Sequence, residues 1–269
     1  MAYSHPVRTD TAFHVPLIGG LFNNKEVGIL MVHNISDLVA TGHDGKPAGW
    51  GLPGGGVSLE RDDNPTEAVR NELLAETGLI VQNPVKVMEI GRIILESGRN
   101  RMTGQRKLLR QIDYEIGQTP PYTFDYSRGG RVIDSHIHAF IGHVNFKDSA
   151  LERLMRDKPR SFRRSTYCGL RMPSFIVRLD ETKFTASEIS ELNIQERDEI
   201  DAIGIFPLSY LARLLSIYDS KRTPREKRVF YKGHLKWATN SISEYENRRR
   251  IEVAQAKLWA DAIAEAEKD

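Results

Sequence analysis

Two glutamates follow a run of glycines in a pattern suited to holding a metal ion and a phosphate-bearing ligand. Residues 54–56 are three consecutive glycines after Trp-Gly-Leu-Pro at 50–53. Glycine permits tight turns and a close approach of the backbone to a ligand. Glu72 and Glu76 are four residues apart, so in a helix both carboxylates project from one face. Hard divalent cations such as Mg²⁺ prefer carboxylates together with phosphate oxygens, and residues 50–79 therefore predict a site of this kind.

The helix that would carry these glutamates has signals at both ends. Asp63 or Asn64 can cap its start, Pro65 suits the first turn, and Glu67 favours the positive end of the helix dipole. Gly78 suits the left-handed residue that closes many helices. The sequence therefore predicts a short helix that begins after the acidic segment and ends at Gly78.

The same stretch resembles the Nudix box, whose pattern is G-x5-E-x7-R-E-U-x-E-E-x-G-U, where U is an aliphatic residue. Glu72, Leu73, Glu76, Gly78 and Leu79 fall on that pattern when it is aligned from its C-terminal end. The lead-in Trp-Gly-Leu-Pro-Gly-Gly and the tail Ala-Glu-Thr-Gly-Leu are the specific parts of the match.

Three positions depart from the box, and the spacing between the glycines and the upstream acid is longer. Asn71 stands in the arginine place, Ala75 replaces the first of the paired glutamates, and Asp63 replaces the upstream glutamate. Asparagine cannot make the bidentate, charge-assisted bonds of arginine. The loss of a carboxylate at Ala75 predicts weaker metal binding or room for a single ion.

The resemblance implies a hydrolase that uses Mg²⁺ or Mn²⁺ to cleave a phosphoanhydride bond in a nucleoside diphosphate linked to another moiety, that is, a Nudix-type pyrophosphohydrolase. The alternative is a nucleotide-binding or regulatory module with weakened catalysis. The implied catalytic residues are Glu72 and Glu76. The implied metal ligands are Glu72, Glu76, Asp63 and a backbone carbonyl of Gly55. The residues expected to contact the small-molecule nucleotide substrate are Trp50, Gly54, Gly55, Gly56 and Arg106.

Further carboxylates and imidazoles lie outside the box. Members of the family often recruit another carboxylate, and Glu188, Glu191 and Glu196 are the candidates. His136 and His138 fall on one side of an alternating strand pattern and could bind a metal or a phosphate. Because no third ligand stands at metal spacing from them, a sheet surface is the favoured interpretation.

Residues 96–133 interrupt the regular pattern and are predicted to be a long inserted loop over the ligand site. They are rich in arginine and tyrosine, which pair with phosphate and stack on bases. Together with the basic residues at 160–164 and 221–228 they could also contact a nucleic acid, although each run alone is more often a solvated surface.

Composition limits the class of protein. Of the 269 residues, 40% are hydrophobic and 28% are charged, which indicates a globular protein. The formal net charge is only +2, so the charge of the whole chain does not favour nucleic-acid binding. The single cysteine, Cys168, excludes an intrachain disulfide and indicates the cytoplasm. No apolar run reaches the ~20 residues of a membrane-spanning helix, so we expect no membrane association.

The predicted architecture is an α/β/α sandwich of the Nudix type with a mixed sheet, the inserted loop and a C-terminal helical extension. Residues 1–11 are predicted to be a polar arm, 12–217 the domain and 218–269 the extension. Strands are expected near 27–32, 80–95, 135–146 and 199–208, with a basic loop at 156–164. The stripe Ile251, Ala254, Leu258 and Ala262 predicts a helix near 244–267 that packs on the domain or forms a homodimer contact.

Overall fold

The computed structural model describes residues 7–22, 26–35, 48–57, 64–99, 106–116, 131–157, 161–179, 185–220 and 229–266. Within these ranges the chain forms ten strands and five helices. In chain order the elements are β1 Val7–Ile18, β2 Gly28–Asn34, β3 Gly49–Gly51, β4 Gly54–Gly56, α1 Pro65–Thr77, β5 Val85–Arg99, β6 Arg106–Glu115, β7 Arg131–His143, α2 Ala150–Asp157, β8 Phe162–Tyr167, β9 Leu170–Arg178, α3 Ala186–Glu191, β10 Ile200–Pro207, α4 Leu208–Ser220 and α5 Lys232–Ala266.

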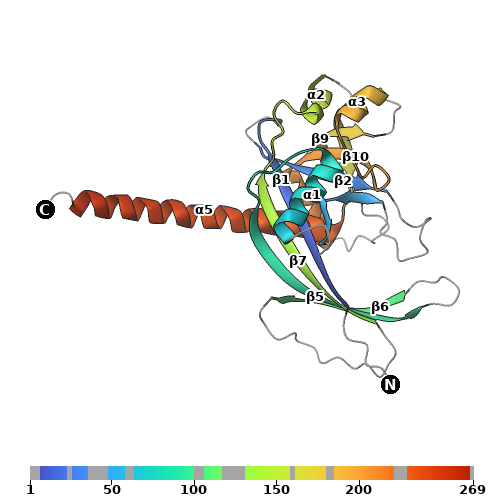
Figure 1. The fold of residues 1–269 in the computed structure, drawn as a ribbon, viewed down its shortest axis with the longest axis horizontal. Helices are drawn as coiled ribbons and strands as arrows, with labels where there is room; N and C mark the ends of the chain where they lie inside the picture. Colours follow the sequence, from blue (N-terminus) through green and yellow to red (C-terminus); the bar gives the residue numbers. More distant parts are fainter. Residues whose placement is uncertain are drawn as a thin grey trace.

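All ten described strands belong to one mixed sheet (Figure 1). The strand order is β6-β5-β7-β1-β2-β10-β9-β8, while the short strands β3 and β4 pair with β2 and β1. The long β1–β7 pair is parallel, and the other pairs are antiparallel. The predicted mixed sheet is therefore present.

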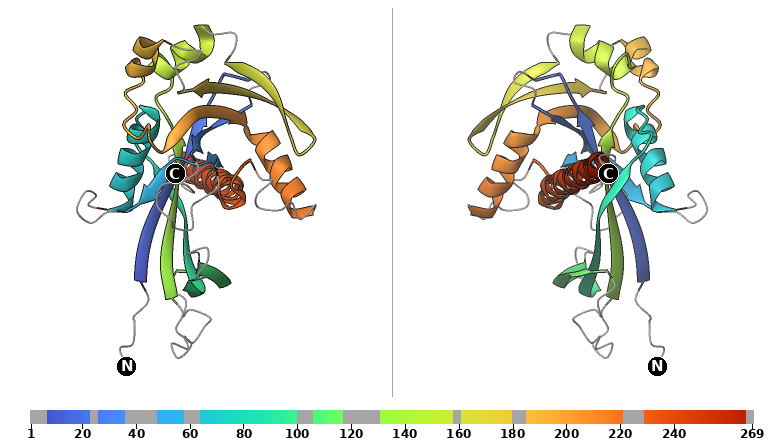
Figure 2. Two further views of the ribbon diagram at one scale, coloured as in Figure 1. Left: turned by 90° about the vertical axis from the view of Figure 1, so that its right-hand side faces the viewer. Right: turned by 90° about the vertical axis from the view of Figure 1, so that its left-hand side faces the viewer.

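Alternation along β1 divides the molecule into layers. Ala12 packs in a small cluster with Phe140 of β7 and with Ala68 of α1. Phe13 and Val15, one and three residues further along β1, point to the other face. They belong to the main core, which includes residues of α4 and α5. Since successive strand residues face opposite sides, α1 covers one face and α4 with α5 covers the other, as Figure 2 shows. The α/β/α layering follows from this arrangement.

Helix α1 forms where the sequence signals indicate. The side chain of Asn64 accepts hydrogen bonds from the backbone N–H groups of Thr66 and Glu67, at 2.9 and 3.1 Å. Pro65 occupies the first helical position, and Gly78 adopts a left-handed conformation with φ 69° while donating its N–H to Leu74 O. Of the two predicted caps, Asn64 is the one observed.

Three sequence predictions about loops are wrong. Strand β1 begins at Val7, so residues 7–11 belong to the sheet and not to an arm. Residues 96–133 are not one long loop, because they contain the end of β5, all of β6 and the start of β7. The predicted basic loop at 156–164 includes the last turn of α2 and the start of β8. In each case these polar residues belong to a regular strand or helix, although their composition predicts irregular backbone.

The C-terminal part of the chain is helical, as predicted, but it does not form a separate extension. Phe230, Leu235 and Ile242 lie in the main core with residues of β1, so the predicted boundary after residue 217 does not hold for the start of α5. Beyond this packed half, α5 leaves the rest of the molecule as a single rod (Figure 1). No helix in the described ranges is both long and apolar enough to cross a membrane.

Candidate functional site

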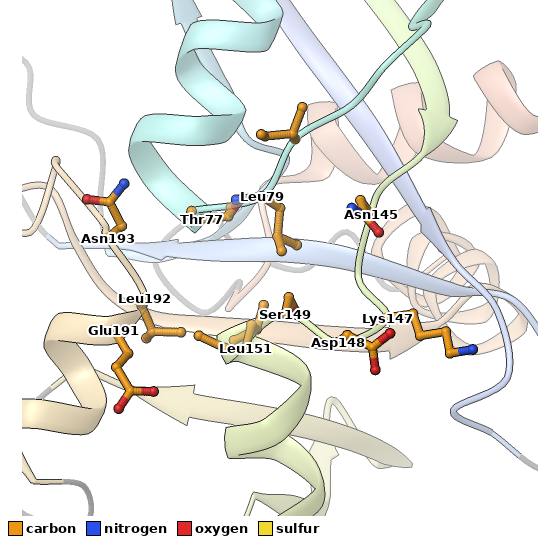
Figure 3. A pocket seen from close by; sticks show the side chains of 13 residues that line it. Thr77, Leu79, Asn145, Lys147, Asp148, Ser149, Leu151, Glu191, Leu192 and Asn193 are labelled. Atoms are coloured by element: carbon orange, nitrogen blue, oxygen red, sulfur yellow. The ribbon is translucent and has the colours of Figure 1, made fainter.

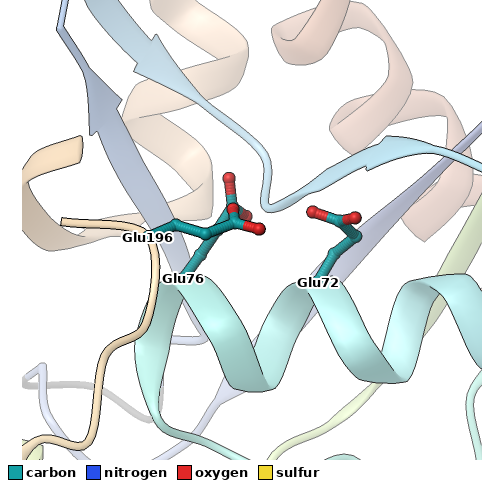
Figure 4. Close-up of side chains that lie close together, drawn as sticks. All are labelled: Glu72, Glu76 and Glu196. Atoms are coloured by element: carbon teal, nitrogen blue, oxygen red, sulfur yellow. The ribbon is translucent and has the colours of Figure 1, made fainter. Parts of the chain in front are cut away.

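Three glutamates converge beside the glycine strand β4. Glu72 and Glu76 project from one face of α1, and Glu196 comes from the segment that precedes β10 (Figure 4). One carboxylate oxygen from each residue lies within 4.8 Å of the others. Glu72 and Glu76 are 6% and 5% exposed, which is rare for glutamate and calls for a compensating positive charge. The two predicted catalytic residues therefore lie together, joined by one of the three candidates from outside the box.

The backbone of α1 holds Glu196 in place. The carbonyl of Ala75 accepts hydrogen bonds from the N–H groups of Gln195 and Glu196, at 2.8 and 3.3 Å. One residue beyond α1, Gly78 packs so closely on this segment that a Cβ there would lie 1.9 Å from the carbonyl oxygen of Leu192. Ala75 lacks the carboxylate that the motif has at this position, but its backbone carbonyl positions the segment that carries the carboxylate of Glu196.

The glycines form strand β4, which lies against β1 and under α1. Gly54 has φ 138°, and a Cβ at this position would lie 2.2 Å from Ala12 O, so only glycine fits. Its N–H donates a hydrogen bond of 2.9 Å to Glu76 Oε2. A Cβ at Gly55 would lie 3.0 Å from Glu72 Oε2. The glycine run therefore lets the backbone meet both carboxylates directly.

The electrostatics of the cluster disfavour its fully ionised state. Burial raises the pKa of Glu76 well above its usual value, and the neighbouring carboxylates Glu72, Glu196 and Glu199 raise it further. The hydrogen bond from Gly54 acts in the opposite direction but does not outweigh them. A cation bound among the carboxylates would reverse this preference, because an opposite charge favours the ionised form.

The donor set fits a hard divalent ion. All three side chains offer carboxylate oxygens, which are the ligands that Mg²⁺ and Mn²⁺ favour, and three ligands leave positions for phosphate oxygens or water. Among the described residues, Glu72, Glu76 and Glu196 are the one group of three or more acidic, histidine or cysteine side chains whose ligand atoms all lie within 4.8 Å of one another.

The other predicted site residues lie in different places. Trp50 packs in the aromatic core against Phe206 and Phe230 and is 5% exposed. Arg106 begins β6, and strands β5, β7 and β1 separate β6 from β4. The side chain of Trp50 is therefore part of the core, and β6 does not adjoin β4 in the sheet. Gly56 ends β4 and is exposed, while Asp63 lies outside the described residues.

Glu199 contributes to the electrostatics of the glutamate cluster, and the sequence did not predict it. Its charge acts on Glu76, although it is three residues beyond Glu196 in the same segment. The segment is closed by hydrogen bonds from the N–H groups of Glu199 and Ile200 to Glu196 O, both 3.2 Å. The Glu-x-x-Glu spacing was the available signal, but it does not indicate contact with a helix more than 100 residues earlier.

A separate cavity of about 440 Å³ lies between the end of α1 and the helices α2 and α3 (Figure 3). Its lining contains none of the three clustered glutamates. Ser149 at its wall donates to Phe146 O and accepts from the N–H of Glu152, and Glu191 pairs with Arg153. Because these polar groups already have partners, the glutamate cluster is the stronger candidate site.

The fold and the site together define a mixed α/β sandwich with a buried carboxylate cluster on a helix that follows a glycine strand. No family model and no curated protein matches the sequence. Solved structures that the chain resembles include Nudix proteins, the family whose motif the sequence resembles.

Three of these structures illustrate the likeness. The Nudix domain of NrtR from Shewanella oneidensis, complexed with ADP ribose, is 11% identical with TM-score 0.38, covering 91% of this chain and 90% of that one. A mutT/nudix family protein from Listeria innocua is 15% identical with TM-score 0.38, covering 90% and 98%. A MutT Nudix hydrolase from Burkholderia pseudomallei is 13% identical with TM-score 0.30, covering 75% and 84%.

Proposed function

We propose that the chain is a divalent-metal-dependent hydrolase that cleaves the phosphoanhydride bond of a nucleoside diphosphate linked to another moiety. The observation that carries the proposal is the convergence of Glu72, Glu76 and Glu196 beside a glycine strand. Two of these residues stand at matching positions of a Nudix-like motif, and the third replaces the carboxylate missing at Ala75.

The chain's residues have distinct parts in this proposal. Glu72, Glu76 and Glu196 would hold Mg²⁺ or Mn²⁺, which when bound neutralises phosphate charge and lowers the pKa of a water molecule. Gly54 orients Glu76 through its N–H group. Hydrolysis forms a bond from water oxygen to phosphorus and breaks the bond to the bridging oxygen, and an ionised carboxylate of the cluster accepts the water proton.

The glycine strand is the proposed place for the phosphates. Gly55 and Gly56 have no side chains to block approach, and a Cβ at Gly56 would meet no atom within 4 Å. Backbone that is open on one side and beside a cation site allows close approach of a phosphate-bearing ligand. The single cysteine, Cys168, supports a reducing, cytoplasmic setting for this activity.

A screen of phosphate-bearing substrates tests the proposal. The full chain is incubated with nucleotide sugars, dinucleotides and nucleoside triphosphates in the presence of Mg²⁺ or Mn²⁺, and released phosphate compounds are measured. We expect metal-dependent turnover of a diphosphate-linked substrate that Glu76→Gln abolishes. Glu67→Gln is the matched control, because Glu67 lies on the same helix but is only partly buried and pairs with Arg70.

A second function has a specific observation in its favour. Asn71 stands where the motif has arginine and Ala75 where it has glutamate, so the chain lacks at these positions the bidentate bonds of arginine and one carboxylate of the motif. If the chain binds nucleoside diphosphates with Mg²⁺ but releases no product, it is a nucleotide-binding regulatory module. Absence of both binding and turnover overturns both functions.

A further inference from the structure

The start of α5 is attached to the strand that leads into the glycine run. The N–H of Trp50 donates to Val229 O at 2.8 Å, and the N–H of Tyr231 donates to Trp50 O at 2.9 Å. Phe230 thus lies beside Trp50 in a parallel bridge, and α5 begins two residues later, at Lys232. The C-terminal part of the chain therefore contacts the backbone just before β4.

Three consecutive residues at the entry to the glycine strand are each held by a different element. The N–H of Leu52 donates to His234 Nδ1 of α5 at 2.8 Å. Pro53 O accepts from a backbone N–H of β1 at 2.9 Å, and the N–H of Gly54 donates to Glu76 Oε2 of α1 at 2.9 Å. Because α5 and α1 cover opposite faces of the sheet, this short connection links His234 on one face with the glutamate cluster on the other (Figure 2).

The imidazole of His234 is held in one orientation by aromatic side chains. It is 9% exposed, and its ring centroid lies 4.7 Å from that of Phe13, 5.0 Å from Trp237 and 5.3 Å from Tyr231. Since the N–H of Leu52 is a donor, Nδ1 must accept, and the neutral ring carries its proton on Nε2. The acceptor for Leu52 is therefore fixed in both position and tautomer.

The strand β3 is shaped to fit this contact. A Cβ at Gly51 would lie 2.9 Å from Tyr231 Cδ2 and 3.1 Å from His234 Nδ1, and a Cβ at Gly49 would lie 3.1 Å from Tyr231 Cε1. Glycine at both positions allows the rings of the C-terminal segment to approach the backbone closely. The glycines before Leu52 thus serve the attachment to α5, while those after it serve the glutamates.

We propose that His234 is a positioning residue of the glutamate site, which fixes Leu52 and thereby keeps the N–H of Gly54 directed at Glu76. Its consequence for catalysis rests on the proposed hydrolase function, whereas its effect on the glycine strand does not. His234 acts through the backbone and not on the reacting atoms. Loss of its acceptor would free the entry of β4 and leave Glu76 without the donor that orients it, which weakens cation binding.

A pair of variants at position 234 separates the hydrogen bond from the packing of the ring. The amide oxygen of asparagine is as many bonds from the backbone as Nδ1, so His234→Asn can still accept from Leu52. The amide oxygen of glutamine corresponds to Nε2 instead, so His234→Gln leaves that N–H without its acceptor. Both variants lose the ring, and the difference between them reports the hydrogen bond.

Amide hydrogen exchange of the metal-free full chain is the first readout. Exchange at Leu52 and Gly54 should be about tenfold or more faster in His234→Gln than in His234→Asn. The rates are compared with those of Leu30 and Met31, which are fully buried in β2 and report the stability of the whole fold. Equal exchange at Gly54 in the two variants, after this comparison, overturns the proposal.

Mg²⁺ calorimetry and turnover of the substrate found by the screen are the second readout. His234→Gln should weaken Mg²⁺ binding by about tenfold or more and lower kcat, and His234→Asn should restore both. Thr239→Ala is the control on α5, because the Thr239 hydroxyl donates to carbonyls of its own helix. Faster exchange at Gly54 with unchanged Mg²⁺ affinity and kcat would show that His234 supports the fold and not the site.

Gly51→Ala perturbs the same contact from the strand and should accelerate exchange at Gly54 in the same way. It decides the question if His234→Gln does not fold. If the parent chain neither binds Mg²⁺ nor turns over a substrate, the proposed function fails. Exchange at Gly54 then still shows whether His234 positions the glycine strand.

Discussion

At the scale of single residues, the burial of Glu76 has a consequence for stability against pH. The pKa of Glu76 is raised in the folded chain above its ordinary value of 4.5, mainly by burial and then by Glu72, Glu196 and Glu199. A raised folded pKa gives a stabilising contribution that is fully present below about pH 4.5 and is lost as pH rises through the folded pKa. Without metal, this residue therefore makes folding less stable with rising pH, by at most about 1.4 kcal/mol per pH unit.

Thermal unfolding of the metal-free chain between pH 4.5 and 8 measures this effect. Glu76→Gln should flatten the pH dependence and raise Tm at pH 8, because glutamine can still accept the Gly54 hydrogen bond without carrying a charge. Adding Mg²⁺ should stabilise the parent and not the variant. Glu67→Gln, a change at a partly buried glutamate on the same helix, should leave the profile as in the parent. Identical profiles for parent and Glu76→Gln would contradict the electrostatic description of the cluster.

Glu196 gives a second prediction at this scale. If its carboxylate replaces the one missing at Ala75, Glu196→Gln should weaken Mg²⁺ binding by at least about tenfold, a loss of about 1.4 kcal/mol. The free energy of unfolding should change little, since Glu196 is only partly buried. Glu191→Gln serves as the control, because Glu191 is exposed on α3 and pairs with Arg153. Equal Mg²⁺ affinity in both variants would remove Glu196 from the site.

The residues of the site could be predicted from the sequence to different degrees. Glu72 and Glu76 were predictable because helical periodicity alone places them on one face. Glu196 remained one of three candidates, because its position depends on hydrogen bonds to Ala75 O that no local pattern encodes. The position of Asp10 beside His136 was not predictable, since it arises from the parallel pairing of β1 with β7, in which partner residues are 126 positions apart in the chain.

At the scale of elements, the end of α1 controls the segment that carries Glu196. Gly78 has φ 69°, and a Cβ there would lie 1.9 Å from Leu192 O. Gly78→Ala should therefore destabilise the fold by about 1–3 kcal/mol and also weaken Mg²⁺ binding, because the segment must move away from α1. Chemical denaturation and calorimetry measure the two effects. Gly169→Ala is the control, having a similar φ of 85° with no atom near its Cβ position.

Comparison of Gly78→Ala with Gly169→Ala separates the effect of the close contact from the effect of the left-handed backbone. Gly169→Ala should lose stability through its left-handed backbone alone and keep full Mg²⁺ affinity. If Gly78→Ala also keeps full affinity, the contact between Gly78 and Leu192 does not position Glu196.

Strand β6 shows why part of the fold was not predictable. Its sequence, RKLLRQIDYE, carries charged residues at both ends, and β6 is an edge strand of the sheet. Charged side chains are common on edge strands because they discourage pairing with other chains. The continuous apolar run that reveals inner strands such as β2 is therefore absent here, and the polar composition predicts a loop instead.

At the scale of the whole molecule, α5 has two halves with different roles. Leu235 is fully buried in the main core, whereas Ile251 and Val253 are 57% and 64% exposed. Arg248 marks the division, donating to the carbonyls of Lys86 and Val87 on β5. Deletion of residues 251–269 should leave the free energy of unfolding within about 0.5 kcal/mol of the parent.

Leu235→Ala is the contrasting change in the packed half of α5. It should cost about 2–5 kcal/mol, because it removes buried methyl groups from a close-packed core. Urea denaturation measures the free energy of unfolding of the deletion variant and of Leu235→Ala. A large loss of stability on deletion of 251–269 would mean that the exposed half of α5 has a stabilising contact, and the mass of the particle in solution would show whether that contact is the predicted homodimer.

The rod formed by the second half of α5 also determines how the molecule moves in solution. Residues 249–266 extend the particle by about 27 Å beyond its body. A particle of this shape rotates faster about the axis of the rod than about the two perpendicular axes. Nuclear spin relaxation would therefore differ between N–H bonds parallel and perpendicular to α5. Small-angle X-ray scattering should show a weak tail at long interatomic distances, which the deletion of 251–269 would remove.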